Sequence, residues 1–216
     1  MQVSPETILE MPNAVLLVDK VKSRLDDERK QRRHFYKIVE DKTIEFINGS
    51  FLQHLPSKLM EVSANNALLS LLDTFVMKNR LGCIGHNKLL VSLSRNDYMP
   101  DICFFGNAKA KNFKPEQTQF PAPDFVVEVL SDSTTKNDRE TKFQDYAAHG
   151  VGEYWIVDAD EQTVEQYFLQ NEQYELSLKA KDGAIESVVL PNFKIPIRAI
   201  FDETENLKAL AELIAN

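Results

Sequence analysis

Apolar side chains follow two spacings along the chain, one typical of short strands and the other of helices. Residues 43–47 and 50–52 are strand-like and flank Asn48-Gly49, a pair that favours a two-residue turn, so they predict an antiparallel hairpin. From about residue 58 to residue 79 the apolar positions recur at helical spacing, and Gly82 follows their end. This stretch predicts the first core helix.

The second half of the chain predicts a strand, a crossover helix and a parallel strand, at residues 125–130, 134–148 and 153–158. Before this unit, residues 84–93 and 101–105 predict another hairpin, and a long loop follows at 106–123. After it we expect three antiparallel strands and a closing helix, at residues 164–169, 174–178, 187–190 and 203–214.

The N-terminal part of the chain is helical in pattern, with breaks, from Ser4 to about residue 33, and Ser4-Pro5 is typical of a helix start. We therefore divide the chain into an N-terminal helical extension, residues 1–34, and one domain, residues 35–216. The order of elements predicts an α/β fold in which a central mixed β-sheet is flanked by helices and carries additional antiparallel strands.

Composition narrows the class of protein. With 43% hydrophobic residues in 216, the chain can bury a full core, and its formal net charge of −8 argues against a nonspecific nucleic-acid binder with a wholly basic surface. Two cysteines are too few for a disulfide framework or a zinc cluster. We found no secretory signal and no apolar stretch of the roughly 18 residues that a membrane span needs, so we expect a cytoplasmic protein without membrane contact.

One carboxylate stands in the middle of an otherwise apolar strand. Residues 123–131 read as a central strand with both faces covered, and Glu128 lies within it. A carboxylate in such a place loses its hydration and keeps its charge only beside a cation, a metal or several hydrogen-bond donors. Glu128 therefore predicts a partner.

Two residues elsewhere are candidates for this partnership. Asp101 stands at the entrance of a short apolar run, and if that run pairs with the Glu128 strand, both carboxylates can reach one ion. Oxygen ligands of this kind suit Mg²⁺, with Mn²⁺ as a substitute. Lys142 follows on the next helix, where Asp138 and Tyr146, four residues to either side, are placed to orient its ammonium.

The same residues also allow a purely structural interpretation. Asp101 would then cap a turn after Pro100, Glu128 would pair with an arginine in the core, and Lys142 would be a surface lysine. Spacing alone leaves both interpretations open.

Two basic groups interrupt the acidic chain. Residues 20–37 hold eight Lys or Arg against three acids, and Lys109, Lys111 and Lys114 form a second group in the predicted long loop. Each is either a solvated surface or a contact to a partner or to phosphate. We take Lys109, Lys111 and Lys114 as the candidate DNA contacts.

Pro100-Asp101 followed by Glu128-Val129-Leu130 resembles the PD-(D/E)xK nuclease superfamily, which has an Asp on one strand and an acid-x-Lys motif on the next. The segments 123–131, 138–146 and 150–158 make the chain similar to the Uma-type restriction endonuclease family over roughly residues 35–180. This resemblance implies a restriction-endonuclease-like core, and a catalytic lysine moved to the helix, as Leu130 and Lys142 match. Members commonly carry a His at the start of the first core helix, where this chain has Glu61-Val62. The wider superfamily often has a glutamate from that helix near the metal, so the resemblance implies this place for Glu61, and the alternative is a first-turn Glu that only interacts with the helix dipole.

The resemblance implies a Mg²⁺-dependent DNA endonuclease that acts as a homodimer. Asp101 and Glu128 would hold the metal, and Lys142 would stabilise the scissile phosphate or orient the attacking water. One alternative is a nuclease-fold module that binds nucleic acid or protein without cutting, which the acidic net charge favours. Another is a metal-dependent phosphodiesterase for a small nucleotide.

Overall fold

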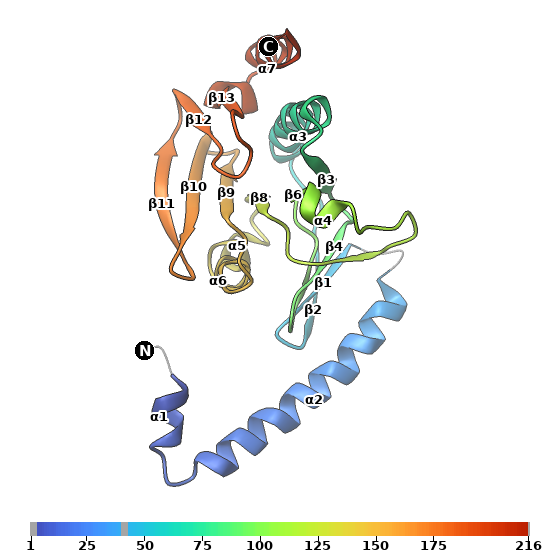
Figure 1. The fold of residues 1–216 in the computed structure, drawn as a ribbon, viewed down its shortest axis with the longest axis vertical. Coiled ribbons are helices and arrows are strands. Elements are labelled where there is room, and N and C mark those ends of the chain that lie inside the picture. The colour runs from blue at the N-terminus through green and yellow to red at the C-terminus, as the bar shows by residue number, and fades with distance from the viewer. Residues whose placement is uncertain (1–3, 40–42, 216) are drawn as a thin grey trace.

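A six-stranded mixed sheet forms the centre of the protein (Figure 1), whose computed structural model describes residues 4–39 and 43–215. Across the sheet the strands lie in the order β11 (Gln173–Ala180), β10 (Thr163–Gln170), β9 (Glu153–Asp158), β8 (Phe125–Val129), β6 (Ile102–Gly106) and β3 (Gly82–His86). β8 and β9 run parallel, and the other neighbours run antiparallel. The predicted mixed sheet is confirmed.

The predicted strand, crossover helix and parallel strand are also present, but the helix is in two pieces. The chain leaves β8, forms α5 (Thr135–Arg139) and α6 (Thr141–Ala148), and returns in β9. Glu140 separates the two helices because its backbone dihedral angles, φ −118° and ψ −75°, depart from those of a regular α-helix. Lys142 consequently lies in the first turn of α6 rather than in the middle of one helix.

Both faces of β8 are covered. Phe125, Val127 and Val129 belong to the core under α3 (Leu59–Asn79), together with η1 (Ile197–Ile200) and α7 (Glu203–Ala215). Val126 and Leu130 belong to the opposite core, which includes Tyr146 of α6. Since side chains alternate along a strand, Glu128 lies on the second face, with α6.

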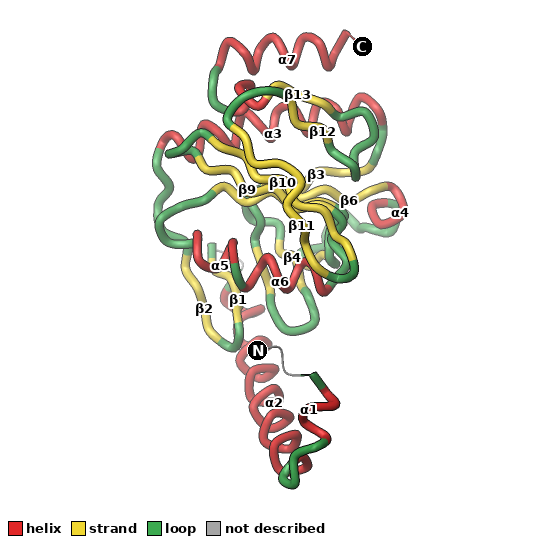
Figure 2. The backbone as a smooth tube through the Cα atoms, turned by 90° about the vertical axis from the view of Figure 1, so that its left-hand side faces the viewer, coloured by secondary structure: helices red, strands yellow, loops and turns green. Residues whose placement is uncertain are grey.

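A second sheet, five-stranded within the described residues, lies beside this face (Figures 1 and 2). Its order is β2 (Ser50–Gln53), β1 (Ile44–Ile47), β5 (Asp97–Tyr98), β4 (Leu90–Ser92) and β7 (Gln119–Phe120). The predicted hairpin of β1 and β2 is confirmed, with Asn48 at φ 49° and Gly49 at φ 80° in its turn. β7 and the short helix α4 (Asn107–Ala110) occupy part of the predicted long loop.

The prediction of one strand over residues 84–93 is wrong. Asn87 adopts a left-handed backbone at φ 55° and ends β3, after which β4 joins the second sheet. Only the first part of the expected strand therefore pairs with residues 101–105, because β3 pairs with β6 in the central sheet. The second part, β4, pairs with β5 in the other sheet.

The predicted strand at residues 187–190 is a loop. The Ser187 hydroxyl and the Val188 and Val189 N–H groups donate to the buried carboxylate of Glu153 instead of to a sheet. The last small sheet pairs β12 (Ala184–Glu186) with β13 (Lys194–Pro196) on either side of this loop.

The N-terminal helices project from the body (Figures 1 and 2). α1 (Pro5–Leu9) begins after Ser4, whose hydroxyl accepts from the Thr7 N–H, and α2 (Ala14–Ile38) runs back toward the sheets. α2 continues through the boundary predicted at residue 34, and its Phe35 is fully buried with Phe46 of β1. Among the described residues, we found no helix whose length and apolar content would let it cross a bilayer.

Candidate active site

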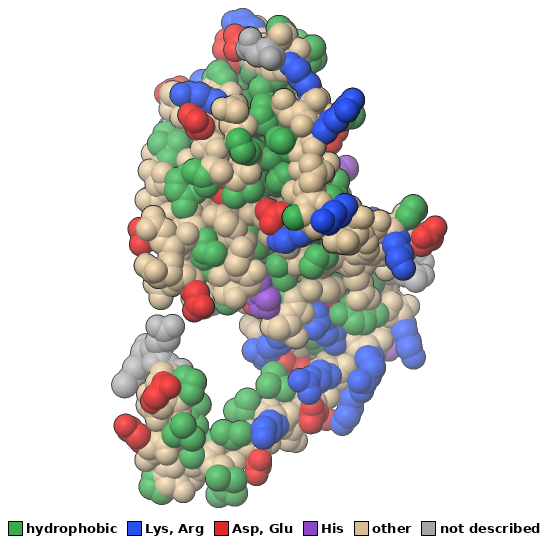
Figure 3. Space-filling model, viewed as in Figure 1, with side chains coloured by type: hydrophobic (Ala, Val, Ile, Leu, Met, Phe, Trp, Pro, Cys, Tyr) green, Lys and Arg blue, Asp and Glu red, His purple; other side chains and the backbone are tan. Residues whose placement is uncertain are grey.

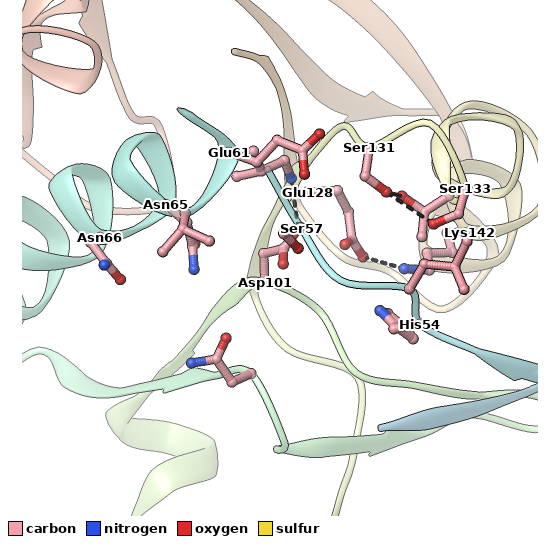
Figure 4. A pocket seen from close by; sticks show the side chains of 15 residues that line it. His54, Ser57, Glu61, Asn65, Asn66, Asp101, Glu128, Ser131, Ser133 and Lys142 are labelled. Atoms are coloured by element: carbon pink, nitrogen blue, oxygen red, sulfur yellow. Dashed lines mark hydrogen bonds and ion pairs between the residues drawn. The ribbon is translucent and has the colours of Figure 1, made fainter. Parts of the chain in front are cut away.

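The pairing of β6 with β8 brings the two predicted carboxylates together (Figure 4). Ile102 lies opposite Val127, and continuing this register by one residue places Asp101 beside Glu128. Asp101 Oδ2 accepts a hydrogen bond from the Val129 N–H at 2.8 Å, which links the entrance of β6 to the end of β8. Both side chains line one pocket, as the prediction of neighbouring strands requires.

Lys142 reaches Glu128 from α6. Its Nζ lies 3.2 Å from Glu128 Oε1, 3.0 Å from Asp138 Oδ1 and 3.1 Å from Glu45 Oε1. The lysine side chain is 1% exposed, and the three carboxylates around it are 0–2% exposed. The structural interpretation of Lys142 as a surface lysine is therefore wrong, and the partner of Glu128 is a lysine rather than an arginine.

Burial and charge act against each other in this group. Loss of hydration raises the pKa of Glu128 well above its usual value, despite the charge of Lys142. It also raises the pKa of Asp101 to about 6, although the Val129 N–H stabilises the charged form. Burial alone would lower the pKa of Lys142, but the carboxylates of Asp138, Glu128 and Glu45 together raise it. The ammonium therefore stays charged at neutral pH.

Glu45 was not anticipated from the sequence. It lies in β1, is 0% exposed, and accepts a hydrogen bond from the Met99 N–H at 2.8 Å, while its Oε2 lies 3.3 Å from His54 Nε2. The charges of Lys142 and His54 outweigh its burial and lower its pKa. Residues 44–47 also hold a lone carboxylate among apolar side chains, but a hairpin strand usually leaves one face to water, so this pattern alone does not predict the burial of Glu45.

The two residues expected to orient Lys142 differ in their contacts. Asp138 forms one of the three ion pairs, although it stands in α5 rather than on the same helix as Lys142. Tyr146 is fully buried, and its hydroxyl finds no hydrogen-bond partner among the described residues. Its ring packs against Tyr98, with centroids 5.2 Å apart.

Glu61 lies at the edge of the pocket, in the first turn of α3 (Figure 4). Its Oε2 accepts a hydrogen bond from the Lys58 N–H at 2.8 Å, so it caps the helix. The opposite oxygen of the carboxylate has no hydrogen bond among those of the described residues. Glu61 thus combines a capping role with a place on the pocket wall.

The predicted DNA-contacting lysines begin at the end of β6 away from Asp101. Lys109 forms an ion pair with Asp124 at 2.7 Å and donates to the Ala122 carbonyl at 2.8 Å. Lys111 and Lys114 are exposed. A role of these lysines in DNA binding stays a prediction, and the contacts of Lys109 make it the least available of the three.

The carboxylate oxygens of the site suit a hard cation that takes only some of its ligands from the protein. No group of three His, Cys, Asp or Glu side chains suited to a metal occurs in residues 4–39 and 43–215. Asp101 and Glu128 offer two carboxylates in a pocket lined mainly by polar side chains, among them Asn65, Ser131 and Thr134. Mg²⁺ is usually held by one or two carboxylates and keeps several waters, so these residues are compatible with it.

The sequence model of a family named Uma2, described as "Putative restriction endonuclease", matches residues 32–198. The chain belongs to the Uma2 family. The match contains every residue of the site described above and leaves out α1 and most of α2. The resemblance of the sequence to this nuclease family is confirmed.

A solved structure shares the fold of this Uma2 member. It is the "putative nuclease belonging to DUF820" from Anabaena variabilis, with a TM-score of 0.64 and 20% sequence identity over 77% of this chain and 90% of that chain. At this identity the likeness shows the fold alone, and it confirms the predicted restriction-endonuclease-like α/β class. A search of curated proteins found no match.

Proposed function

We propose that this Uma2 protein is a Mg²⁺-dependent DNA endonuclease in which Asp101 and Glu128 hold the metal, with Mn²⁺ as a substitute. The observation that carries the proposal is a pair of neighbouring carboxylates, Glu128 buried and Asp101 partly buried, that have raised pKa values and open into a polar pocket. Two such groups repel each other when ionised, and a divalent cation between them would relieve both the repulsion and the lost hydration. The family description supports the reaction class.

A metal bound there would polarise the scissile phosphate and lower the pKa of its bound water. The protein's own contribution is an ammonium held at a fixed point. Lys142 has three N–H donors and pairs with Glu45, Asp138 and Glu128, so the donor that faces Glu128 would serve a phosphate oxygen or the attacking water once Glu128 holds a metal. The burial of Lys142 keeps competing water away from it.

DNA is the proposed substrate, and a pair of copies is the proposed active form. One site cuts one strand at a time, and cleavage of a duplex therefore calls for two sites. Lys111 and Lys114 remain candidate contacts to the DNA backbone, since both are exposed and basic.

One observation favours the alternative of a nuclease-fold module that binds without cutting. Three carboxylates enclose Lys142 almost completely, an arrangement that a structural ion cluster would also show. Such a protein would still bind DNA or another protein through its surface.

Incubation of supercoiled plasmid with Mg²⁺, Mn²⁺ or a chelator separates these functions. We expect nicked or linear DNA with metal and none with chelator, and loss of cleavage in Asp101→Asn. Asp124→Asn is the matched control, because Asp124, like Asp101, directly precedes a strand of the site, but it pairs with Lys109 outside the pocket. Binding without cleavage in either metal supports the non-cutting module, and turnover of a small nucleotide diester alone supports a phosphodiesterase.

A further inference from the structure

The arm formed by α1 and α2 exposes several large apolar side chains. Within the arm Leu9 is 75% exposed, Val15 73%, Leu16 71% and Val21 55%. The run Ala14–Val18 is apolar at five consecutive positions, which at 100° per residue surround the helix, so a single neighbour such as α1 cannot cover them all. Exposed apolar side chains gathered in this way are typical of an interaction surface.

The body of the protein holds only the C-terminal half of α2. Arg32 binds Asp97 at 2.6 Å, Glu28 pairs with Arg95 at 2.8 Å, and Phe35 is buried. On the same stripe of the helix, Ala14, Val18, Val21 and Leu25 recur at spacings of four, three and four, the pattern of a coiled-coil seam. The seam therefore continues from the anchored half into the half that projects.

Charge divides along the arm (Figure 3). Residues 4–19 carry three acidic side chains, Glu6, Glu10 and Asp19, and no basic one. Residues 20–37 carry eight Lys or Arg against three acids, and they lie nearer the body. No ion pair joins Glu6, Glu10, Asp19, Lys20, Lys22 or Arg24 to another described residue.

We propose that the arm binds the arm of a second copy of this chain in antiparallel orientation. The acidic, apolar end of each arm then lies against the basic half of the other, and the exposed leucines and valines are covered. DNA fits less well, because it would leave the apolar end exposed and repel its three acids. The Uma2 match starts at residue 32, so this surface belongs to a segment outside the matched region.

The proposal rests on the pairing of copies proposed for duplex cleavage and supplies the surface for it. Its test measures mass rather than cleavage, so an inactive protein that dimerises and an active protein that does not are told apart. The measurement is sedimentation velocity of the full chain over a wide range of concentration, in which the wild type forms dimers.

Two charge variants make the test specific to the antiparallel arrangement. One carries Glu6→Lys, Glu10→Lys and Asp19→Lys, and the other carries Lys20→Glu, Lys22→Glu and Arg24→Glu. All six side chains are exposed, and circular dichroism checks that the fold is unchanged. Each variant alone opposes like charges and should dimerise at least about tenfold more weakly, whereas the two mixed together restore opposite charges and the dimer.

A wild-type monomer at every concentration overturns the proposal, and so do charge variants that dimerise as well alone as when mixed. Leu16→Asp adds an independent check, because a charge in the apolar contact should weaken dimerisation at least about thirtyfold. A loss of DNA affinity in the Lys20, Lys22 and Arg24 variant with no change in mass would assign the arm to DNA instead.

Discussion

Lys142 Nζ and Glu128 Oε1 lie 3.2 Å apart in the interior, and the lysine comes from α6, the second of the two helices that follow the glutamate's strand. The pair does not stand alone, because Glu45 and Asp138 complete a group of three carboxylates around one ammonium. Such a group has a net negative charge. Asp101 next to it adds another carboxylate, and the surplus is the physical reason to expect a cation.

Replacing Lys142 by Met should destabilise the fold strongly. Met preserves most of the packing but leaves three buried carboxylates without their cation, a change that costs about 3–5 kcal/mol. Urea unfolding measures the difference. Lys109→Met is the control, since its pair with Asp124 is one-third exposed and should contribute under about 1 kcal/mol. Equal losses of stability in the two variants would show that the buried ion pairs of Lys142 contribute no more than a surface pair.

Glu45 and Glu128 contact the same ammonium, but neutralising each of them should change the stability of the fold in opposite directions. The pKa of Glu45 is lowered in the fold, so its charge contributes stability at neutral pH, and Glu45→Gln should destabilise. The pKa of Glu128 is raised, so its charge opposes folding there, and Glu128→Gln should stabilise. Each change should exceed the about 0.5 kcal/mol of an ordinary surface substitution in thermal unfolding at neutral pH. Changes of the same sign would contradict the pKa directions.

Asp101 should make stability fall as the pH rises through the range from about 4 to about 6. Its pKa is about 6 in the fold against an ordinary value of 3.8, so the folded protein binds the proton more tightly than the unfolded chain. Above this range the wild type loses about 1–3 kcal/mol that Asp101→Asn keeps. The measurement is urea unfolding of both proteins in metal-free buffer at several pH values. A difference between them that does not change with pH would contradict the raised pKa of Asp101.

Lys111 and Lys114 should account for part of the salt dependence of DNA binding. Replacing both by Ser removes two exposed charges, and the slope of log affinity against log salt should fall by roughly 2. Fluorescence anisotropy with a labelled duplex measures this slope. Lys179→Ser and Lys194→Ser together form the control, since both are exposed lysines on other elements. An unchanged slope in the Lys111 and Lys114 variant would assign those lysines to solvation.

Much of the fold followed from local patterns, and the departures have identifiable physical causes. β8, β9 and the crossover were predictable because a buried parallel strand reads as an apolar run. The break of residues 84–93 depends on a left-handed Asn87, a conformation that asparagine permits but does not require. Residues 187–190 have a strand-like composition, yet the N–H groups of Val188 and Val189 donate to the distant Glu153. No local pattern contains that contact.

The candidate site was also predictable in part from local patterns. Glu128 and Asp101 stand out because each carboxylate borders or interrupts an apolar run, and Lys142 follows from the return of the helix across the strand. Glu45 lies in a hairpin strand, which usually leaves one face to water. Its burial comes from the packing of the second sheet against α6, a relationship between segments about a hundred residues apart that no local spacing records.

Titration calorimetry with Mn²⁺ at neutral pH tests the central claim most directly, because it detects the metal site whether or not the protein cuts DNA. The wild type and the control Asp124→Asn should bind one Mn²⁺ per chain, and Asp101→Asn and Glu128→Gln should each lose that binding. Thermal unfolding of the same samples shows that the variants are folded. Equal Mn²⁺ binding in all four proteins, or none in the wild type, would contradict a metal site at Asp101 and Glu128.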